Sequence, residues 1–240
     1  MRNIKTLPKA RVPIVKFTDS ITNISCDICF NNRLALQNTR LLSDYSRIDE
    51  RTQQLGFLIK YWAKRRMINE PYSGTLSSYA YILMVIHFLQ TRSPPILPCL
   101  QQLAFNEEKI LVIDGFNCYY YDRIDNLLNF GKNNKQSIGE LLTAFFRFYA
   151  CEFDYEGLVI SIRTGRYLTK SEKQWDKKSD DPRENFLLTI EDPFEITHNL
   201  GRVVDAAGLK IIQEEFERAF KMICNNEPLS AVCKKYKDQK

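Results

Sequence analysis

The spacing of apolar residues changes once along this 240-residue chain, and the change constrains the fold more than any other feature. Two short runs at 12–17 and 24–30 are rich in β-branched and aromatic residues, and the polar stretch 18–23 separates them. Such a pattern predicts a β-hairpin. From 31 to about 92, apolar residues instead recur every three to four positions, as on one face of a helix. We therefore predict an α+β fold in which a small sheet precedes a mostly helical region.

Three helices are predicted in the first helical stretch. The apolar spacing places one around 34–42 and a second around 55–63. A third starts near Thr75 and continues to about Leu89, because Ser93-Pro94-Pro95 stops it soon afterwards.

The rest of the chain alternates loops with short strands and two further helices. Residues 98–135 are rich in loop-forming residues, with a short strand predicted at 110–113. Ser137 and Glu140 have the spacing of a capping box at the start of an apolar helix that ends near Phe153. The later predictions are a strand at 159–162, a polar and mobile surface loop at 164–185, and a last helix at 209–224.

Charge and cysteine content argue against several classes of protein. The formal net charge of +5 gives a mildly basic surface, which suits a polyanionic partner but does not demand one. The seven cysteines are odd in number, which favours reduced thiols in the cytoplasm, or in the nucleus, over a disulfide framework. Cys26 and Cys29 form a CxxC, but two histidines and no second CxxC argue against a zinc site. The longest apolar stretch, 79–89, is about half the length of a membrane span, and no secretory signal follows Met1, so we expect no membrane contact.

Two charged features have both a chemical and a structural interpretation. Asp27 lies within an apolar strand, where a carboxylate is costly unless it is paired or bound to a metal. The alternative is a position on the solvent face of an edge strand. Lys60 and Lys64 are four residues apart on a predicted helix, so both ammonium groups project from one face. That face either binds an anion, such as a triphosphate, or is only solvated.

Two polar segments have the composition of ligand-binding turns. Residues 74–79 place small hydroxyl side chains and then Tyr79 at a helix start, where free backbone N–H groups favour phosphate. A capped core helix would have the same composition. Residues 190–199 gather carboxylates, His198 and an amide after a predicted strand. A single histidine is more often structural than functional, so neither segment decides the function alone.

Together these segments resemble one family. The shared segments are Cys26-Asp27-Ile28, Asn31-Asn32, Lys60 to Arg65, Gly74 to Tyr79, Pro94 to Pro98, Phe145 to Ala150 and Ile190 to Arg202. Their order and spacing over residues 8–220 are similar to those of the Cid1-type terminal uridylyltransferases, within the noncanonical poly(A) polymerase group of DNA polymerase β-like nucleotidyltransferases. The resemblance implies a remnant of the nucleotidyltransferase sheet at 1–43. A mostly helical, PAP/OAS1-like central domain follows at 44–240, with a PAP-associated region at about 137–200.

The resemblance also implies roles for single residues. Asp27 matches the third catalytic carboxylate, which helps to bind Mg²⁺ or Mn²⁺ and accepts the proton of the attacking RNA 3′-hydroxyl. Asn38 and Thr39 match residues that recognise the ribose and the base, with Asn38 placed to read the 2′-hydroxyl. Lys60 and Lys64 match contacts to the triphosphate.

The other implied contacts surround the triphosphate and the base. Ser78 matches a further triphosphate contact, and Tyr79 matches the aromatic residue on which the base stacks. Asp192 and Glu195 match polar contacts near the base. His198 matches a histidine that favours uracil over adenine, because its N–H can donate to uracil O4 where adenine presents an amino donor.

The chain departs from this family in one respect. Relatives carry a Gly-Ser and an Asp-x-Asp pair before the hairpin, and neither occurs in these 240 residues. Because two strands alone are marginally stable, we expect the other strands of the sheet to lie outside this sequence. We therefore predict a uridylyltransferase that uses UTP and an RNA 3′ end, needs no obligate protein partner, and is inactive as this fragment. The alternatives are a noncanonical poly(A) polymerase and a non-catalytic nucleotide- or RNA-binding remnant.

Overall fold

The computed structural model describes residues 1–9, 12–105, 107–176 and 186–236. It begins with a three-stranded antiparallel sheet of β1 (Arg2–Leu7), β2 (Ile14–Thr18) and β3 (Ser25–Cys29), in that order. β2 and β3 pair along their full length, so the predicted hairpin is confirmed. The sequence does not predict β1, because only Ile4 and Leu7 of its six residues are apolar. The expectation that all other strands lie outside the chain is therefore wrong for β1.

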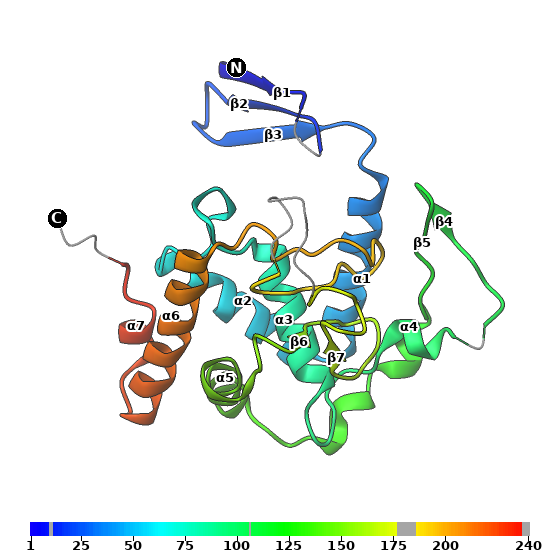
Figure 1. Cartoon of the computed structure of the whole chain (residues 1–240), viewed down its shortest axis with the longest axis vertical. Coiled ribbons are helices and arrows are strands. Elements are labelled where there is room, and N and C mark those ends of the chain that lie inside the picture. The colour runs from blue at the N-terminus through cyan, green and yellow to red at the C-terminus, as the bar shows by residue number, and fades with distance from the viewer. Residues whose placement is uncertain (10–11, 106, 177–185, 237–240) are drawn as a thin grey trace.

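The sheet lies at one end of the molecule, and α1 (Arg33–Ile48) joins it to the helical body (Figure 1). None of the residues in its three strands is fully buried. Large apolar side chains such as Ile4 and Ile28 stay exposed. α1 is unbroken, so the domain boundary expected at 43/44 falls inside this helix.

The helical body is organised around α3 (Ser78–Gln90), in which ten of the 13 side chains are buried. Other helices of the body are α2 (Glu50–Arg65), α5 (Ile138–Arg147) and α6 (Ala206–Cys224). The predictions of α1, α2, α3 and α6 from apolar spacing are confirmed, with different ends. α3 starts three residues later than predicted, because Gly74 takes a left-handed conformation (φ 75°) and the Ser77 hydroxyl accepts the Ala80 N–H as the cap. The capping box of Ser137 and Glu140 opens α5 as predicted.

An aromatic cluster fills the space where α2, α5 and α6 meet. The ring of Trp62 lies edge-on to Phe146 at 4.9 Å and 5.0 Å from Phe216, measured between ring centroids. Phe145 and Tyr149 join the same cluster, and all five side chains are buried. Burying a side chain of this kind contributes about 2–3 kcal/mol, so this cluster is a main source of the body's stability.

Short elements connect these helices and cover the body. They are α4 (Leu100–Leu103), β4 (Val112–Ile113), β5 (Phe116–Asn117), a π turn (Phe148–Glu152), β6 (Leu158–Val159), β7 (Leu168–Thr169) and α7 (Leu229–Val232), with 3₁₀ turns at Pro71–Ser73, Ile124–Leu127 and Phe130–Asn133. The strands predicted at 110–113 and 159–162 correspond to β4 and β6. No helix within the described segments is both long and apolar enough to cross a membrane.

The prediction of a polar surface loop at 164–185 holds only in part for its described residues, 164–176, which are mostly exposed but include a short strand. β7 pairs with β6, and Leu168, Lys170 and Trp175 are buried. The Lys170 ammonium donates to the carbonyls of Tyr155 and Phe186 at 2.7 and 2.6 Å. Tertiary hydrogen bonds therefore order a segment whose polar sequence looks like a loop. Residues 177–185 of the predicted loop lie outside the described residues.

Candidate nucleotide-binding site

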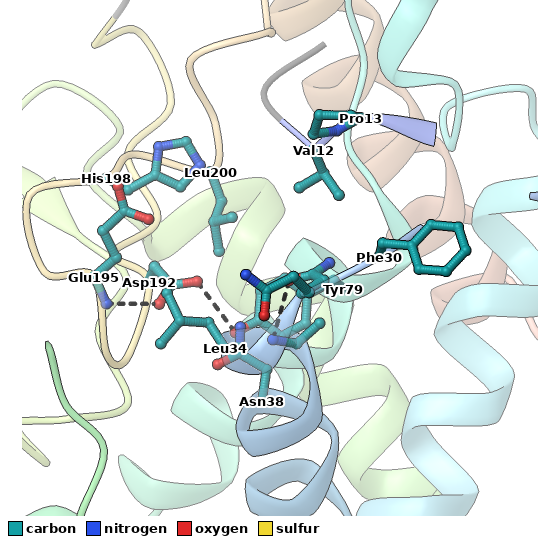
Figure 2. Close-up of a pocket in the computed structure, with 13 residues that line it drawn as sticks. Val12, Pro13, Phe30, Leu34, Asn38, Tyr79, Asp192, Glu195, His198 and Leu200 are labelled. Atoms are coloured by element: carbon teal, nitrogen blue, oxygen red, sulfur yellow. Dashed lines mark hydrogen bonds between the residues drawn. The ribbon is translucent and has the colours of Figure 1, made fainter. Parts of the chain in front are cut away.

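A cleft of about 360 Å³ is lined by residues next to β2 and β3, by α1 and α3, and by the segment 192–200 (Figure 2). Five of the residues expected to bind the nucleotide lie in its wall: Asn38, Tyr79, Asp192, Glu195 and His198. They come from three separate parts of the chain. The fold, rather than local sequence, brings them together.

Asn38 extends the buried stripe of α1 into the cleft. Leu41 and Tyr45, three and seven residues further on, are buried on the core side of the same helix. The Asn38 Oδ1 is buried and has no hydrogen-bond partner among the described residues. An unsatisfied buried acceptor costs about 1–3 kcal/mol, and a hydroxyl of a bound ligand could satisfy it.

Tyr79 lines the cleft from the start of α3. Its hydroxyl donates to Asp192 Oδ2 at 3.4 Å. Burial, and then the nearby Asp192 carboxylate, raise the pKa of Tyr79 well above its usual value, so the hydroxyl stays protonated. This bond ties α3 to the segment that carries the other polar residues of the cleft.

The segment 190–199 is a closed loop that presents Glu195 and His198 at the rim. Asp192 Oδ1 accepts the backbone N–H groups of Phe194 and Glu195 at 3.0 and 2.9 Å. The backbone N–H of His198 donates to the Glu195 carbonyl, and the backbone N–H of Asp192 donates to the His198 carbonyl. In Figure 2, Glu195 and His198 lie on one side of the cleft, and Pro13 and Phe30 lie on the other.

Four of the predicted nucleotide contacts are not in the wall of this cleft. The Thr39 hydroxyl donates to the Ala35 carbonyl within α1, and the Ser78 hydroxyl donates to Asn69 Oδ1, both at 2.8 Å. Lys60 and Lys64 lie on the outer side of α2, half-buried and exposed respectively. Neither lysine forms an ion pair with any carboxylate of the described residues. Both charges are therefore available to an anion.

Asp27 takes the second of its two expected positions. It lies on β3, an edge strand, with its side chain about half exposed, and its Oδ2 is 3.2 Å from the Lys16 ammonium on β2. Within the described part of the chain, no group of three or more His, Cys, Asp or Glu side chains could hold a metal ion. Mg²⁺ is bound through oxygen ligands in a near-octahedral arrangement, so one carboxylate beside an ammonium group does not fit it. The described residues therefore do not form the implied Mg²⁺ or Mn²⁺ site.

The apolar part of the wall was not predicted. Val12, Pro13, Phe30, Leu34 and Leu200 line the cleft together with the polar residues. One signal existed in the sequence, since Phe30 is a large apolar residue at the end of a strand, next to Asn31-Asn32. In the structure, the Phe30 side chain lines the cleft and is strongly exposed.

Two family models match different parts of the chain. The model described as Cid1 family poly A polymerase matches residues 137–198, and the central palm domain of mitochondrial-like poly(A) RNA polymerase matches residues 1–47. The chain is 42% identical over 233 residues to terminal uridylyltransferase cid1 of Schizosaccharomyces pombe, which covers 91% of this chain and 56% of that protein. It is 39% identical over 237 residues to poly(A) RNA polymerase cid13 of the same organism, which covers 98% of this chain and 40% of that protein. The chain thus spans 56% or less of these relatives.

Solved structures share the fold. A structure of Cid1 in complex with the UTP analog UMPNPP matches this chain with a TM-score of 0.85 at 39% identity, covering 98% of this chain and 73% of that one. A crystal structure of the Cid1 poly(U) polymerase matches with a TM-score of 0.86 at 39% identity and the same coverage. The predicted α+β class, with a nucleotidyltransferase sheet and a mostly helical central domain, is therefore confirmed. The chain belongs to the Cid1 family of poly(A) polymerase-like nucleotidyltransferases.

Proposed function

We propose that this chain is the nucleotide-binding part of an RNA 3′-terminal uridylyltransferase, which adds UMP from UTP to an RNA 3′ end. The observation that carries the proposal is the cleft, whose wall contains Asn38, Tyr79, Asp192, Glu195 and His198. The relative cid1, 42% identical, is named a terminal uridylyltransferase. UTP and an RNA 3′ end are the partners, and no obligate protein partner or membrane is part of the proposal.

Each wall residue makes a different contact to UTP in this proposal. The ring of Tyr79 stacks on the base. The buried Oδ1 of Asn38 accepts the ribose 2′-hydroxyl, which would satisfy that atom. A ring N–H of His198 donates to uracil O4, where adenine would present a second donor. Asp192 and Glu195 complete the polar surroundings of the base.

The triphosphate lies outside this cleft, against α2 and the start of α3. Lys60 and Lys64 supply two charges on one face of a helix, which suits a polyanion. The Ser78 hydroxyl, bonded to Asn69 here, is within the first turn of α3, where helix N–H groups favour phosphate. The Thr39 hydroxyl donates its hydrogen to the Ala35 carbonyl, so its oxygen is still able to accept a hydrogen bond from the ribose or the base.

The 240 residues bind nucleotide but do not transfer it, in our proposal. Asp27 supplies one carboxylate on an exposed strand, and a pair of metal ions needs several. The metal ligands would have to be completed by residues beyond those described. A nucleotide-binding, non-catalytic role is therefore the second candidate for this chain by itself.

Surface charge and thiols support the remaining parts of the proposal. The net charge of +5 suits contacts to RNA phosphates that do not depend on sequence. All seven cysteines are free thiols, the state expected in the cytoplasm or the nucleus. We propose a cytoplasmic location, with the nucleus as the alternative.

Calorimetric titration of the 240-residue chain with UTP and with ATP tests the nucleotide. We expect UTP to bind about tenfold more tightly, as one additional base contact would give. His198→Ala should reduce this preference, and Tyr79→Ala should weaken both nucleotides. Tyr72→Ala, a strongly exposed tyrosine that does not line the cleft, is the matched control.

Two results would count against the proposal. Tighter binding of ATP would favour a poly(A) polymerase, the name carried by the 39% identical relative cid13. Extension of a labelled RNA by these 240 residues, with UTP and Mg²⁺ or Mn²⁺, would contradict the proposed inactivity of the chain alone.

A further inference from the structure

Glu191 is a buried carboxylate with no role in the contacts described so far. Its side chain is fully buried. It accepts hydrogen bonds from Ser161 Oγ at 2.6 Å, from Arg163 Nε and Nη2 at 3.1 and 3.0 Å, and from Lys173 Nζ at 2.7 Å. Burial alone would raise the pKa of Glu191, but the bonds from Arg163, Lys173 and Ser161 outweigh it and hold the pKa below its usual value. Glu191 is thus a fixed anion next to the cleft.

Lys173 connects this anion to the tip of the 190–199 loop. Its ammonium donates to Glu191 Oε1 and also to the backbone carbonyl of Ile196. An ammonium group has three donors, so one lysine can make both bonds. Only about an eighth of the Lys173 side chain is exposed, and the ammonium lies 4.7 Å from the Trp175 ring, which limits its movement.

The position of Ile196 makes this connection relevant to the cleft. Ile196 directly follows Glu195 and lies two residues before His198. Glu195 and His198 both line the cleft. The base of the loop is held separately, since the Glu191 N–H donates to the Ile160 carbonyl and the Asn199 side chain bonds to the backbone of Ile190 and Leu188. Among the described residues, Lys173 therefore links the buried network to the part of the loop between Glu195 and His198.

We propose that Lys173, fixed by Glu191, is a positioning residue for base selection, because it sets where the loop presents Glu195 and His198. The inference rests on the proposed function for its substrate, but not for its geometry. Loss of the ammonium leaves the Ile196 carbonyl without this donor and loosens the tip, while Arg163 still neutralises Glu191. The contact with the base is then weakened more than contacts to ribose and phosphate.

The test compares Lys173→Met with Lys170→Met in the 240-residue chain. Lys170 is the matched control, because it is buried, lies three residues away and donates to the carbonyls of Tyr155 and Phe186, outside the loop. Titration with UTP and ATP should show the ratio of the two affinities falling roughly 3- to 10-fold in Lys173→Met, the loss of about one hydrogen bond. Lys170→Met should lower thermal stability and leave the ratio unchanged. Lys173→Arg should restore much of the ratio.

A second readout does not require nucleotide. The chain has only two histidines, His87 and His198, so the ring signals in a ¹H–¹³C NMR spectrum are easily assigned. We expect Lys173→Met to shift or broaden the His198 signal, and Lys170→Met to leave it in place. His87, buried in α3, reports on the core.

The outcomes separate the two proposals. If the wild-type chain prefers UTP and Lys173→Met keeps the ratio, the positioning role is overturned and the proposed function stands. If the wild-type chain shows no preference for UTP, the proposed function is overturned, and the NMR comparison decides the positioning role. An unchanged His198 signal in Lys173→Met overturns that role in either case.

Discussion

The sheet and the helical body of this protein are stabilised in different ways. In the body, Trp62, Phe146 and Phe216 pack in a fully buried aromatic cluster. In the sheet, no strand residue is fully buried, and Ile28 stays exposed. Strand pairing without a core gives only marginal stability. The cleft therefore has one wall that the body holds in place and one wall whose order depends on a weakly stabilised sheet.

The largest expected effect tests the core of the body. Phe216→Ala removes a ring at the centre of the cluster and should lower the free energy of unfolding by about 3–5 kcal/mol. Urea denaturation followed by tryptophan fluorescence measures it, because Trp62 and Trp175 both lie in the body. Ile28→Ala on β3 is the control and should change stability by about 0.5 kcal/mol or less, as at an exposed surface position. A loss of similar size in both variants would show that sheet and body share one core.

The next effect is the acid sensitivity that His87 gives to the body. Burial lowers the pKa of His87 to about 4, against the smaller opposing effect of its hydrogen bond with the Ser161 carbonyl. The unfolded chain binds this proton below about pH 6.5, so between pH 6.5 and 4 it holds more protons than the folded chain. The contribution of His87 to the free energy of unfolding should therefore be full above pH 6.5 and fall by up to about 3 kcal/mol as the pH drops to 4.

His87→Gln isolates this contribution. The difference in stability between wild type and variant, measured by urea denaturation at several pH values, should shrink from pH 7 to pH 4. Residues 1–29 contain no histidine, so the sheet does not contribute to the change. A difference that is the same at every pH would contradict the buried, neutral state of His87.

The same contrast explains which parts of the fold the sequence predicts. The stripe of Leu55, Ile59 and Trp62 predicts α2 because all three are buried against the body. β1 has no such stripe, since strand pairing rather than apolar burial holds it. Apolar spacing does not predict β7 either. The Lys170 ammonium orders this polar segment by donating to carbonyls that are distant in sequence.

The residues of the candidate site also differ in how far the sequence predicts them. Spacing alone marks Lys60 and Lys64 as a pair and leaves Asp27 with two interpretations, and composition marks the segments 74–79 and 190–199. Asn38, Thr39 and the individual roles of all these residues are expected only from the resemblance. Their roles remain predictions. Phe30 gave a weak signal as a large apolar residue at a strand end, but the apolar wall as a whole forms only where the end of the sheet, α1 and Leu200 come together in the fold. The link from Lys173 to Ile196 also escapes the sequence, because 23 residues separate the two partners.

The smallest expected effect is on an ion pair of the sheet, which is compared here with an ion pair of the body. The exposed pair of Asp27 and Lys16 should contribute no more than about 1 kcal/mol, because water screens both charges and two side chains lose freedom. In the body, Glu215 lies between Arg66 and Arg218 at 2.7 and 2.8 Å and is almost buried. Removing its charge leaves two arginines without their partner and should cost about 3 kcal/mol or more. Asp27→Asn and Glu215→Gln, compared by urea denaturation at pH 7, should therefore differ severalfold. A cost for Asp27→Asn that approaches that of Glu215→Gln would mean that the sheet is as firmly held as the body, and the second wall of the cleft would then be preformed as well.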